Sequence, residues 1–263
     1  MFLRRLSENL KSQNWTAIAI ELVILVLGVY LGLQAQEWSN RRQADATAAE
    51  YTERLMADFR SELWVRTMLY EYYDDVAQNN ERVLDAIEGR VTMADDALLV
   101  AAYRATQYIQ WYAKPSTYDE LLSTGAVDMI RDKGLREQAR LTFGSQLMDR
   151  MEREGDEARF RVAFRSVVPL PVQRELGRHC GDRSIFEVGD FSKLSDPLDY
   201  PCESGLDQAQ IAESLEAIRA IDGLGPMLRF RVAQINTRRS ALGFNIANIR
   251  KLLEASDAGS VSP

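Results

Sequence analysis

The sequence predicts an all-α protein, with one N-terminal transmembrane helix running into a multi-helix extracytoplasmic bundle that carries a disulfide-stapled loop. Three observations lead to this prediction. Residues 15–36 are almost uninterruptedly apolar, apolar side chains recur every three or four residues through most of the remainder, and both cysteines, Cys180 and Cys202, lie in a segment rich in Gly, Pro and Ser. The predicted parts are a short cytoplasmic interfacial segment (1–14), the span (15–36), a helical domain (37–256) and a flexible tail (257–263).

The apolar run has the length and the flanks of a membrane span. A helix from Ala17 to Ala35 would be about 28 Å long, close to the hydrocarbon thickness of a bilayer. Trp15 and Trp38 would then lie at the two membrane–water interfaces, which favour amphipathic rings. A cleaved signal peptide fits less well, because the run is longer than a signal h-region and Leu33 would occupy a small-residue position of the cleavage site. A buried helix of a soluble protein is the other alternative.

Charges and cysteines orient the span. Positive charge is slightly more abundant before it (Arg4, Arg5, Lys11 and the free amine) than directly after it (Arg41, Arg42), which favours a cytoplasmic N-terminus. Both cysteines lie in the large C-terminal part, and an even number of cysteines fits an oxidising compartment. The sequence therefore predicts that the main domain is extracytoplasmic and that Cys180 and Cys202 form a disulfide.

One side of the predicted span is suited to helix–helix contact. At 100° per residue, Glu21, Gly28 and Gly32 fall on the same side, and Gly28 and Gly32 form the G-x-x-x-G spacing that lets two backbones approach closely in lipid. Glu21 should face protein or water, because a charge exposed to hydrocarbon costs several kcal/mol. The alternative is that Glu21 reaches the head groups or stays protonated. Expected partners are membrane lipid and either a second copy or another membrane protein.

Composition excludes several function classes. Residues 1–42 hold five basic and three acidic side chains, which leaves 27 basic and 36 acidic residues, a net charge of −9, for the rest of the chain. Such an acidic domain repels phosphate backbones, so we expect no nucleic-acid partner. His179 is the single histidine, and the sequence has no phosphate-cradling loop, dinucleotide fingerprint or H-E-x-x-H motif. We therefore expect no enzyme activity and no cofactor.

The first part of the domain predicts a long helix followed by a corner. Residues 41–88 contain no Pro and no Gly, which favours a helix continuous with the span and capped by Gly89. A second helix is expected over 94–113, before Pro115. Ser116 or Thr117 would cap a third helix, with Thr117 and Glu120 as a capping box and Gly125 as its terminator. The corner is interpreted as a sharp reversal; a binding role for Tyr118, Asp119 and Glu120 is the alternative.

Two segments resemble a known family. The run from Glu21 to Gly28 (ELVILVLG), followed by Leu33-Gln34 and Glu37-Trp38, resembles the opening of an uncharacterised family of single-span bacterial membrane proteins. The segment 117–125 (TYDELLSTG), followed by Met129-Ile130 and Leu135-Arg136, is similar to a second patch of that family. The resemblance covers about a fifth of the chain. It implies a membrane-anchored helical protein, and it provides no catalytic residue to carry over. Together with the orientation inferred above, the expected location is the bacterial inner membrane, with the N-terminus in the cytoplasm and the main domain in the periplasm.

The rest of the chain predicts further helices around one irregular segment. A helix is expected over 135–168, ended by Pro169 and Pro171, then a loop at 179–206, a helix capped by Asp207, and a last helix from about Pro226 to Ala255. A Cys180–Cys202 bridge would staple the loop, which is the best candidate for a recognition surface. His179, Asp182, Glu187, Asp190 and the cysteines fit no zinc or calcium signature, so no metal is expected.

Two functions fit these predictions. The first is a non-catalytic, membrane-anchored helical interaction or assembly protein of the bacterial inner membrane. The second is a ligand-binding sensory or accessory subunit of a membrane complex, since helical bundles outside a membrane often bind ligands between helices. The 14-residue segment before the span leaves no room for an output domain, so we expect that a sensor would need a partner.

Overall fold

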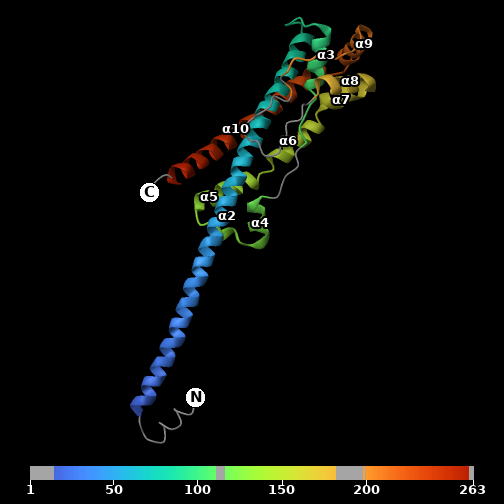
Figure 1. Ribbon diagram of the computed structural model, residues 1–263. Helices are drawn as coiled ribbons and strands as arrows, with labels where there is room; N and C mark the ends of the chain where they lie inside the picture. Colours follow the sequence, from blue (N-terminus) through green and yellow to red (C-terminus); the bar gives the residue numbers. More distant parts are fainter. Residues whose placement is uncertain (1–14, 111–115, 182–197, 199, 261–263) are drawn as a thin grey trace. The chain divides into compact units, whose positions relative to one another are not determined.

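The computed structural model describes residues 15–110, 116–181, 198 and 200–260, and all regular structure within them is helical (Figure 1). The elements are α2 (Trp15–Ile87), α3 (Asp95–Arg104), α4 (Thr117–Thr124), η1 (Val127–Met129), α5 (Lys133–Phe143), α6 (Leu147–Asp156), α7 (Arg159–Val167), α8 (Leu170–Cys180), α9 (Gln208–Arg219) and α10 (Leu224–Ser260). The all-α prediction is confirmed. The predicted segment 1–14 lies outside the described residues.

The chain divides into two units, and each is described by itself. The first comprises residues up to Glu53 together with Met129–Arg131; the second comprises Arg54–Asp128 and Asp132–Pro263. Within the first unit, α2 begins at Trp15 and continues without interruption past the apolar run, and Arg131 forms an ion pair with Asp45. The predicted continuity of the apolar helix with residues 41–88 is confirmed, because no Pro or Gly interrupts the backbone hydrogen bonds there.

Helix α2 ends at a glycine cap, as its sequence predicts. Gly89 adopts a φ of 73°, a left-handed conformation that glycine reaches without a Cβ penalty. The amide of Arg90 then donates to the carbonyl of Asp85 at 2.8 Å, which satisfies one of the last carbonyls of the helix.

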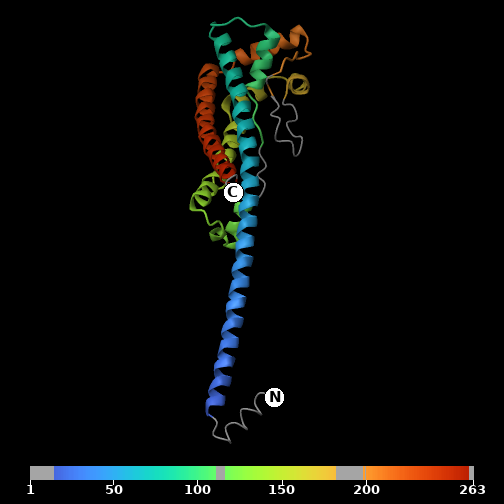
Figure 2. The ribbon, with the colours of Figure 1, turned by 60° about the vertical axis from the view of Figure 1, so that its left-hand side comes forward.

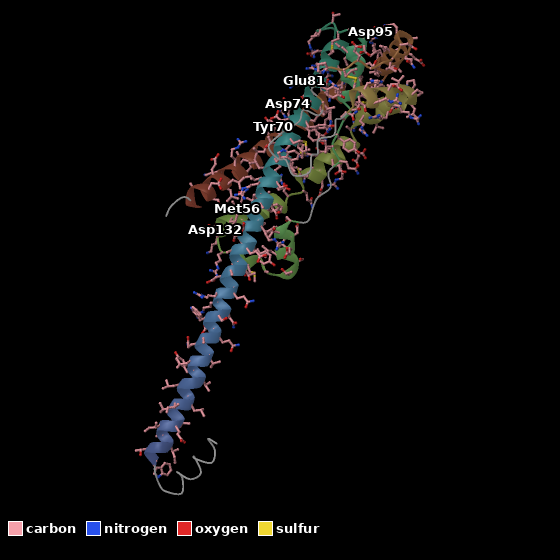
Figure 3. All side chains as sticks on the ribbon, in the orientation of Figure 1. Met56, Tyr70, Asp74, Glu81, Asp95 and Asp132 are labelled. Carbon is pink, nitrogen blue, oxygen red and sulfur yellow. A yellow bond between two sulfur atoms is a disulfide. The ribbon has the colours of Figure 1, made fainter. Side chains whose placement is uncertain are left out.

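In the second unit, α10 runs antiparallel to the part of α2 that follows Arg54 (Figures 1 and 2). Three ion pairs mark this pairing along its length: Glu88–Arg229 at 2.6 Å, Asp74–Arg239 at 2.7 Å and Arg60–Asp257 at 3.6 Å. Tyr70 and Asp74 lie one turn apart on α2 (Figure 3), and the guanidinium of Arg239 lies 4.4 Å from the centre of the Tyr70 ring. The last helix therefore packs on the first rather than forming a separate lobe.

Two apolar clusters form the core of the second unit. One joins the end of α2 with α3, α7, α8, α9 and the start of α10, around Leu99, Phe164, Leu176 and Leu228. The other joins α2, α6 and the middle of α10, around Tyr72, Val76, Met151 and Leu242. Because α2 and α10 contribute to both clusters, the pair forms the frame on which the short helices pack.

The helix predicted over 94–113 is shorter than expected. It ends at Arg104, where Ala105 is its C-cap. Polar side chains satisfy the final carbonyls: Asn80 donates to the carbonyl of Ala105 at 3.0 Å, and Thr106 donates to that of Tyr103 at 2.6 Å. The prediction relied on Pro115 as the terminator, whereas these buried hydrogen bonds end the helix about nine residues earlier.

The single helix predicted over 135–168 is wrong, because this stretch forms α5, α6 and α7. The first break falls at Gly144, the C-cap of α5; the second falls at Glu157 and Ala158. A Cβ on Gly155, near the second break, would lie 2.4 Å from the Cβ of Tyr108, so the chain passes very close there. The apolar spacing continues across both breaks, and therefore did not reveal them.

The C-terminal half contains one helix that was not predicted. Pro169 ends α7 as expected, but it is also the N-cap of α8, with Pro171 in its first turn, where a missing amide hydrogen costs nothing. This helix shortens the predicted irregular loop, of which residues 182–197 and 199 lie outside the described residues. The capping of α9 by Asp207 is confirmed, with Gln210 completing a capping box. Helix α10 extends to Ser260, so the predicted tail from residue 257 begins too early.

Candidate functional site

The apolar stretch of α2 is the most exposed hydrophobic surface of the described chain. The best 18-residue window has a mean hydropathy of 2.2, and none of it is buried. Large apolar residues from Ile20 to Leu33 are exposed by half or more, as are Trp15 and Trp38 at its ends. Soluble proteins rarely expose so large a patch, and length and composition make this helix a candidate membrane span.

The three residues predicted for helix contact lie on this exposed stretch. A Cβ added to Gly28 or Gly32 would meet no heavy atom within 4 Å, apart from the helix's own nearby backbone. Glu21 is partly buried, and its Oε2 atom has no hydrogen-bond partner among the residues described. The glycine face is therefore open to a second helix, while its use in helix pairing stays a prediction.

The predicted corner is present, but its capping box is one residue earlier than expected. The N-cap is Ser116, whose hydroxyl accepts from the amide of Asp119, while the Asp119 carboxylate accepts from the amide of Ser116 at 2.8 Å. Thr117 instead donates its amide hydrogen to the Asp58 carboxylate at 2.6 Å, and Glu120 pairs with Arg54. The Thr117–Glu120 box is thus wrong.

The terminator of the corner is confirmed. Gly125 has a φ of 69°, and its amide and that of Ala126 donate back into the last turn of α4. A side chain at Gly125 would find open space, so the cost of replacing it lies in the backbone conformation alone.

The predicted disulfide is confirmed: Cys180 at the end of α8 is bonded to Cys202, with the two Cα atoms 5.6 Å apart. Arg104, from the end of α3, organises the backbone around it. Its Nε donates to the carbonyl of Cys180 at 3.3 Å, and its Nη2 lies 3.0 Å from the carbonyl of Tyr200 and 3.3 Å from the Cys202 sulfur. The guanidinium also stacks over the Tyr200 ring at 4.4 Å. One buried arginine therefore holds both ends of the stapled segment against α3.

An open groove lies beside this arginine, with a volume of about 320 Å³. Its walls come from α2, α3 and the segment at Tyr200–Cys202, and its polar groups are Asn79, Arg82 and Arg104. Asn79 already donates to the carbonyl of Asp75, and Arg104 already donates to the carbonyls of Cys180 and Tyr200. Arg82 is exposed, so it is the charged side chain of the groove that a small molecule could contact most readily. The groove has the volume of a small-molecule site.

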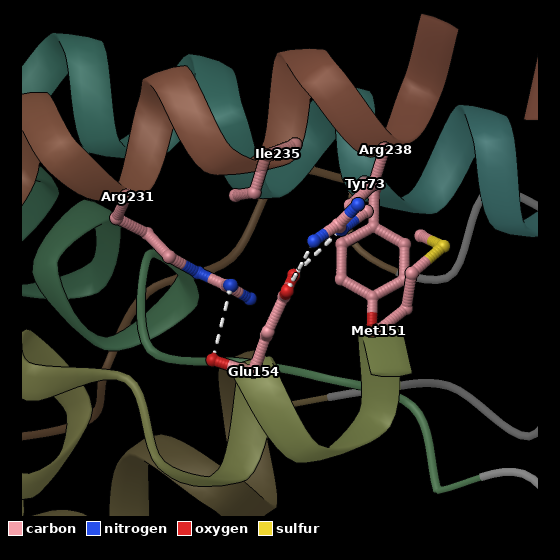
Figure 4. A pocket seen from close by; sticks show the side chains of 6 residues that line it. All are labelled: Tyr73, Met151, Glu154, Arg231, Ile235 and Arg238. Carbon is pink, nitrogen blue, oxygen red and sulfur yellow. Dashed lines mark hydrogen bonds and ion pairs between the residues drawn. The ribbon is translucent and has the colours of Figure 1, made fainter. Parts of the chain in front are cut away.

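A second buried arginine, Arg231 on α10, lies beside the second core cluster (Figure 4). Its side chain is 4% exposed, and its Nη1 donates to the carbonyl of Glu154 at 3.2 Å and to Gln234 at 2.8 Å. The Nε and Nη2 atoms have no partner in the described part of the chain. Burial lowers the pKa of Arg231, and neighbouring Tyr73 and Glu154 oppose that shift.

The space beside Arg231 is too small for a ligand. The cavity between Tyr73, Met151, Glu154 and Arg238 has a volume of about 10 Å³, near the minimum for a single water molecule. The charged groups around this cavity have a structural role, because Arg238 forms two hydrogen bonds to the Glu154 carboxylate and so links α10 to α6. No group of His, Cys, Asp or Glu side chains suited to a metal ion occurs in the ranges that the structure covers.

The sequence reasoning missed these buried arginines, although a signal was present. Of the 32 basic residues only five are lysine. Arginine is the cation that suits buried carbonyl and aromatic contacts, because its planar fork donates in several directions and is weakly hydrated. In the run from Arg159 to Arg165, Phe160 and Phe164 are buried and Arg161 donates to the carbonyl of Thr106 at 3.0 Å.

Comparison of the chain with protein-family models, with curated proteins and with solved structures finds no match. The resemblance to single-span bacterial membrane proteins therefore stays a prediction.

Proposed function

We propose that this protein is a non-catalytic, membrane-anchored interaction or assembly protein of the bacterial inner membrane. The observation that carries the proposal is the exposed apolar stretch of α2, with exposed Trp15 and Trp38 at its ends and an open Gly28/Gly32 face. Lipid would cover most of this helix, and a second helix, from another copy or another membrane protein, would cover the glycine face.

The proposed topology places the N-terminus in the cytoplasm and the main domain in the periplasm. Positive charge before the span and the Cys180–Cys202 disulfide support this orientation, because disulfides persist in oxidising compartments. An alkaline phosphatase fused after Pro263 would then be active. Activity of a cytoplasmic reporter at the same position would instead reverse the topology.

The proposed pairing is tested by the span's own residues. With Gly28→Leu and Gly32→Leu combined, backbones can no longer approach, and we expect loss of the proteins or copies that co-purify through the span in mild detergent. Val26→Leu with Tyr30→Leu is the matched control, because these residues have the same spacing on the opposite face. Disulfide cross-linking through Leu25→Cys, near the glycine face, but not through Val26→Cys, would identify a second copy as the partner. Identical complexes in both double variants would contradict the proposal.

A ligand-binding sensory or accessory subunit is the second candidate, and the groove beside Arg104 is the observation that favours it. Ala97 lines this groove and is exposed, so Ala97→Trp would fill it without disturbing the core. Native mass spectrometry of the full chain in detergent would show a retained small molecule that disappears in Ala97→Trp and persists in the control Leu122→Trp, on α4. No retained molecule in the wild-type chain favours the assembly function.

A further inference from the structure

The solvent-facing side of α10 lacks charged side chains along most of its length, which is unusual for a surface helix. Between Arg229 and Arg250 it carries no charged side chain toward solvent. The three arginines within that stretch turn inward: Arg231 is buried, Arg238 binds Glu154, and Arg239 binds Asp74 while stacking on Tyr70. A surface helix ordinarily directs its charges to water.

Two phenylalanines occupy this uncharged face. Phe230 is 65% exposed and Phe244 is 68% exposed, the two most exposed phenylalanines among the described residues. They are 14 residues apart, which is close to four full turns, so both rings lie on the same side of α10. The face between them is made of small side chains, with Ala233 and Thr237 exposed and Ala241 partly buried. Two exposed rings thus flank a strip of small residues.

The residues of this strip are arranged symmetrically along the sequence. Taking Thr237 as the centre, identical residues lie four and seven positions away in both directions: Ala233 pairs with Ala241, and Phe230 pairs with Phe244. A contact with two-fold symmetry needs a surface complementary to itself, in which residue i of one copy meets residue j of the other and the reverse. In an antiparallel pair centred on Thr237, each Phe230 would meet the partner's Phe244.

We propose that the outward face of α10 is a self-association surface, on which a second copy of this chain binds through its own α10 in antiparallel orientation. The contact is separate from the pairing proposed for the span. Aromatic rings would meet aromatic rings at both ends, and the small residues between them would let the helices approach to the usual 8–10 Å, an order-of-magnitude packing distance.

Charged residues at the two ends of this face support a second copy of the chain as the binding partner. Asp222 lies in the turn directly before α10, 15 positions before Thr237, and Lys251 lies on α10, 14 positions after Thr237, with Arg250 next to it. All three are exposed. In the antiparallel pair, Asp222 of each copy falls beside Lys251 of the other, giving two symmetric attractive pairs. In a parallel pair, Lys251 and Arg250 would face the same residues of the other copy and repel them.

The size of the face fits a modest contact. From Pro226 to Asn248, eleven positions on either side of Thr237, the helix is roughly 33 Å long. Burying four exposed phenylalanine side chains removes on the order of 500 Å² from water, and the small residues and end pairs bring the total toward the ~1,000 Å² of a specific interface. An area at this lower limit is typical of weak, transient contacts, which suit copies concentrated on one surface.

The symmetry gives a test by cysteine cross-linking of the full chain in detergent micelles, in the Gly28→Leu/Gly32→Leu background so that span contacts do not contribute. Thr237→Cys lies on the proposed axis and should form disulfide-linked dimers with itself. Phe230→Cys alone and Phe244→Cys alone should cross-link poorly, while a mixture of the two should cross-link well. Self-linking of Phe230→Cys at least as strong as that of Thr237→Cys would mean a parallel contact and overturn the proposal, as would failure of every position to cross-link.

A second measurement separates self-association from loss of folding. Phe230→Glu and Phe244→Glu should each weaken self-association at least ~10-fold, measured by sedimentation in micelles, without lowering the unfolding temperature, since both side chains point outward. Val162→Glu, on α7, is the matched control because Val162 is 58% exposed and outside the face. Asp222→Lys should weaken the dimer, and adding Lys251→Asp should restore it. Equal effects of Val162→Glu and Phe244→Glu on self-association would refute the proposal. Binding of the Phe230/Phe244 face to phosphatidylglycerol vesicles, with no binding to a second copy, would also refute it.

Discussion

Arg238 on α10 binds Glu154 on α6 through two parallel hydrogen bonds, one of them from Nε at 2.9 Å. The two side chains are 24% and 18% exposed, so the pair is largely shielded from water. The backbone carbonyl of the same glutamate accepts from the buried Arg231. Glu154 therefore fixes the register between α6 and α10, which in turn directs the uncharged face of α10 outward.

Removing this carboxylate should destabilise the second unit. We expect Glu154→Ala to lower the free energy of unfolding by about 1–2 kcal/mol, because it leaves a partly buried guanidinium without its acceptor. Urea unfolding of the full chain in detergent measures this. The control is Glu137→Ala, which breaks the exposed Glu137–Arg140 pair and should leave the free energy of unfolding nearly unchanged. Equal effects of the two substitutions would show that Glu154 is not an anchor.

The glycine at the end of α4 provides a test of backbone conformation. Gly125→Val should cost about 1–2 kcal/mol, because a β-branched residue is strained at a φ of 69° although space is available for its side chain. Gly125→Asn should cost less, since asparagine tolerates the left-handed region. Thermal unfolding followed by circular dichroism measures both. An unfolding temperature for Gly125→Val that equals the wild-type value would rule out the structural interpretation of the corner.

The Cys180–Cys202 disulfide should stabilise the fold, and Arg104 should protect this bond from reduction. Replacing both cysteines by alanine should lower the free energy of unfolding by roughly 3 kcal/mol, from the chain entropy of a loop of this length. Arg104→Lys keeps the charge but loses the fork that reaches the carbonyls of Cys180 and Tyr200, so we expect faster reduction of the bond by dithiothreitol. The reduction rate is followed by thiol labelling. An unchanged rate in Arg104→Lys would mean that Arg104 does not protect the bond.

Glu62 predicts a pH dependence of stability. Burial raises the pKa of Glu62 above its usual 4.5, and the nearby Arg66 guanidinium opposes this. Because the folded chain then binds the proton more tightly than the unfolded chain, this group's contribution to stability is complete below 4.5 and is lost as the pH rises through the folded pKa. Glu62→Gln should therefore flatten the unfolding free energy against pH just above that value. Parallel curves for wild type and variant would contradict the assignment.

The sequence predicted the long elements well, because their signals are local and repeated. The unbroken helicity of residues 41–88, the glycine caps at Gly89 and Gly125 and the Asp207 cap all depend on neighbouring residues, and the structure shows each of them. The Cys180–Cys202 bond was the single pairing that two cysteines allow within a chain.

The errors lie where tertiary contacts override local signals. Residues 135–168 keep their apolar spacing across Gly144 and Glu157, so periodicity could not separate α5, α6 and α7. The end of α3 is set by Asn80, which is distant in sequence. Composition indicates only that arginine is the dominant basic residue; it does not single out Arg104 and Arg231 as the buried ones, because several of their acceptors are backbone carbonyls, which carry no sequence signal.

Anchoring of the chain in a lipid bilayer by residues 15–36 can be measured by alkaline carbonate extraction of membranes that contain the full chain. We expect the protein to stay in the membrane pellet, and to move to the supernatant when Leu25, Leu27 and Leu31 are replaced by aspartate. Release of the wild-type chain into the supernatant would show that residues 15–36 do not anchor the protein.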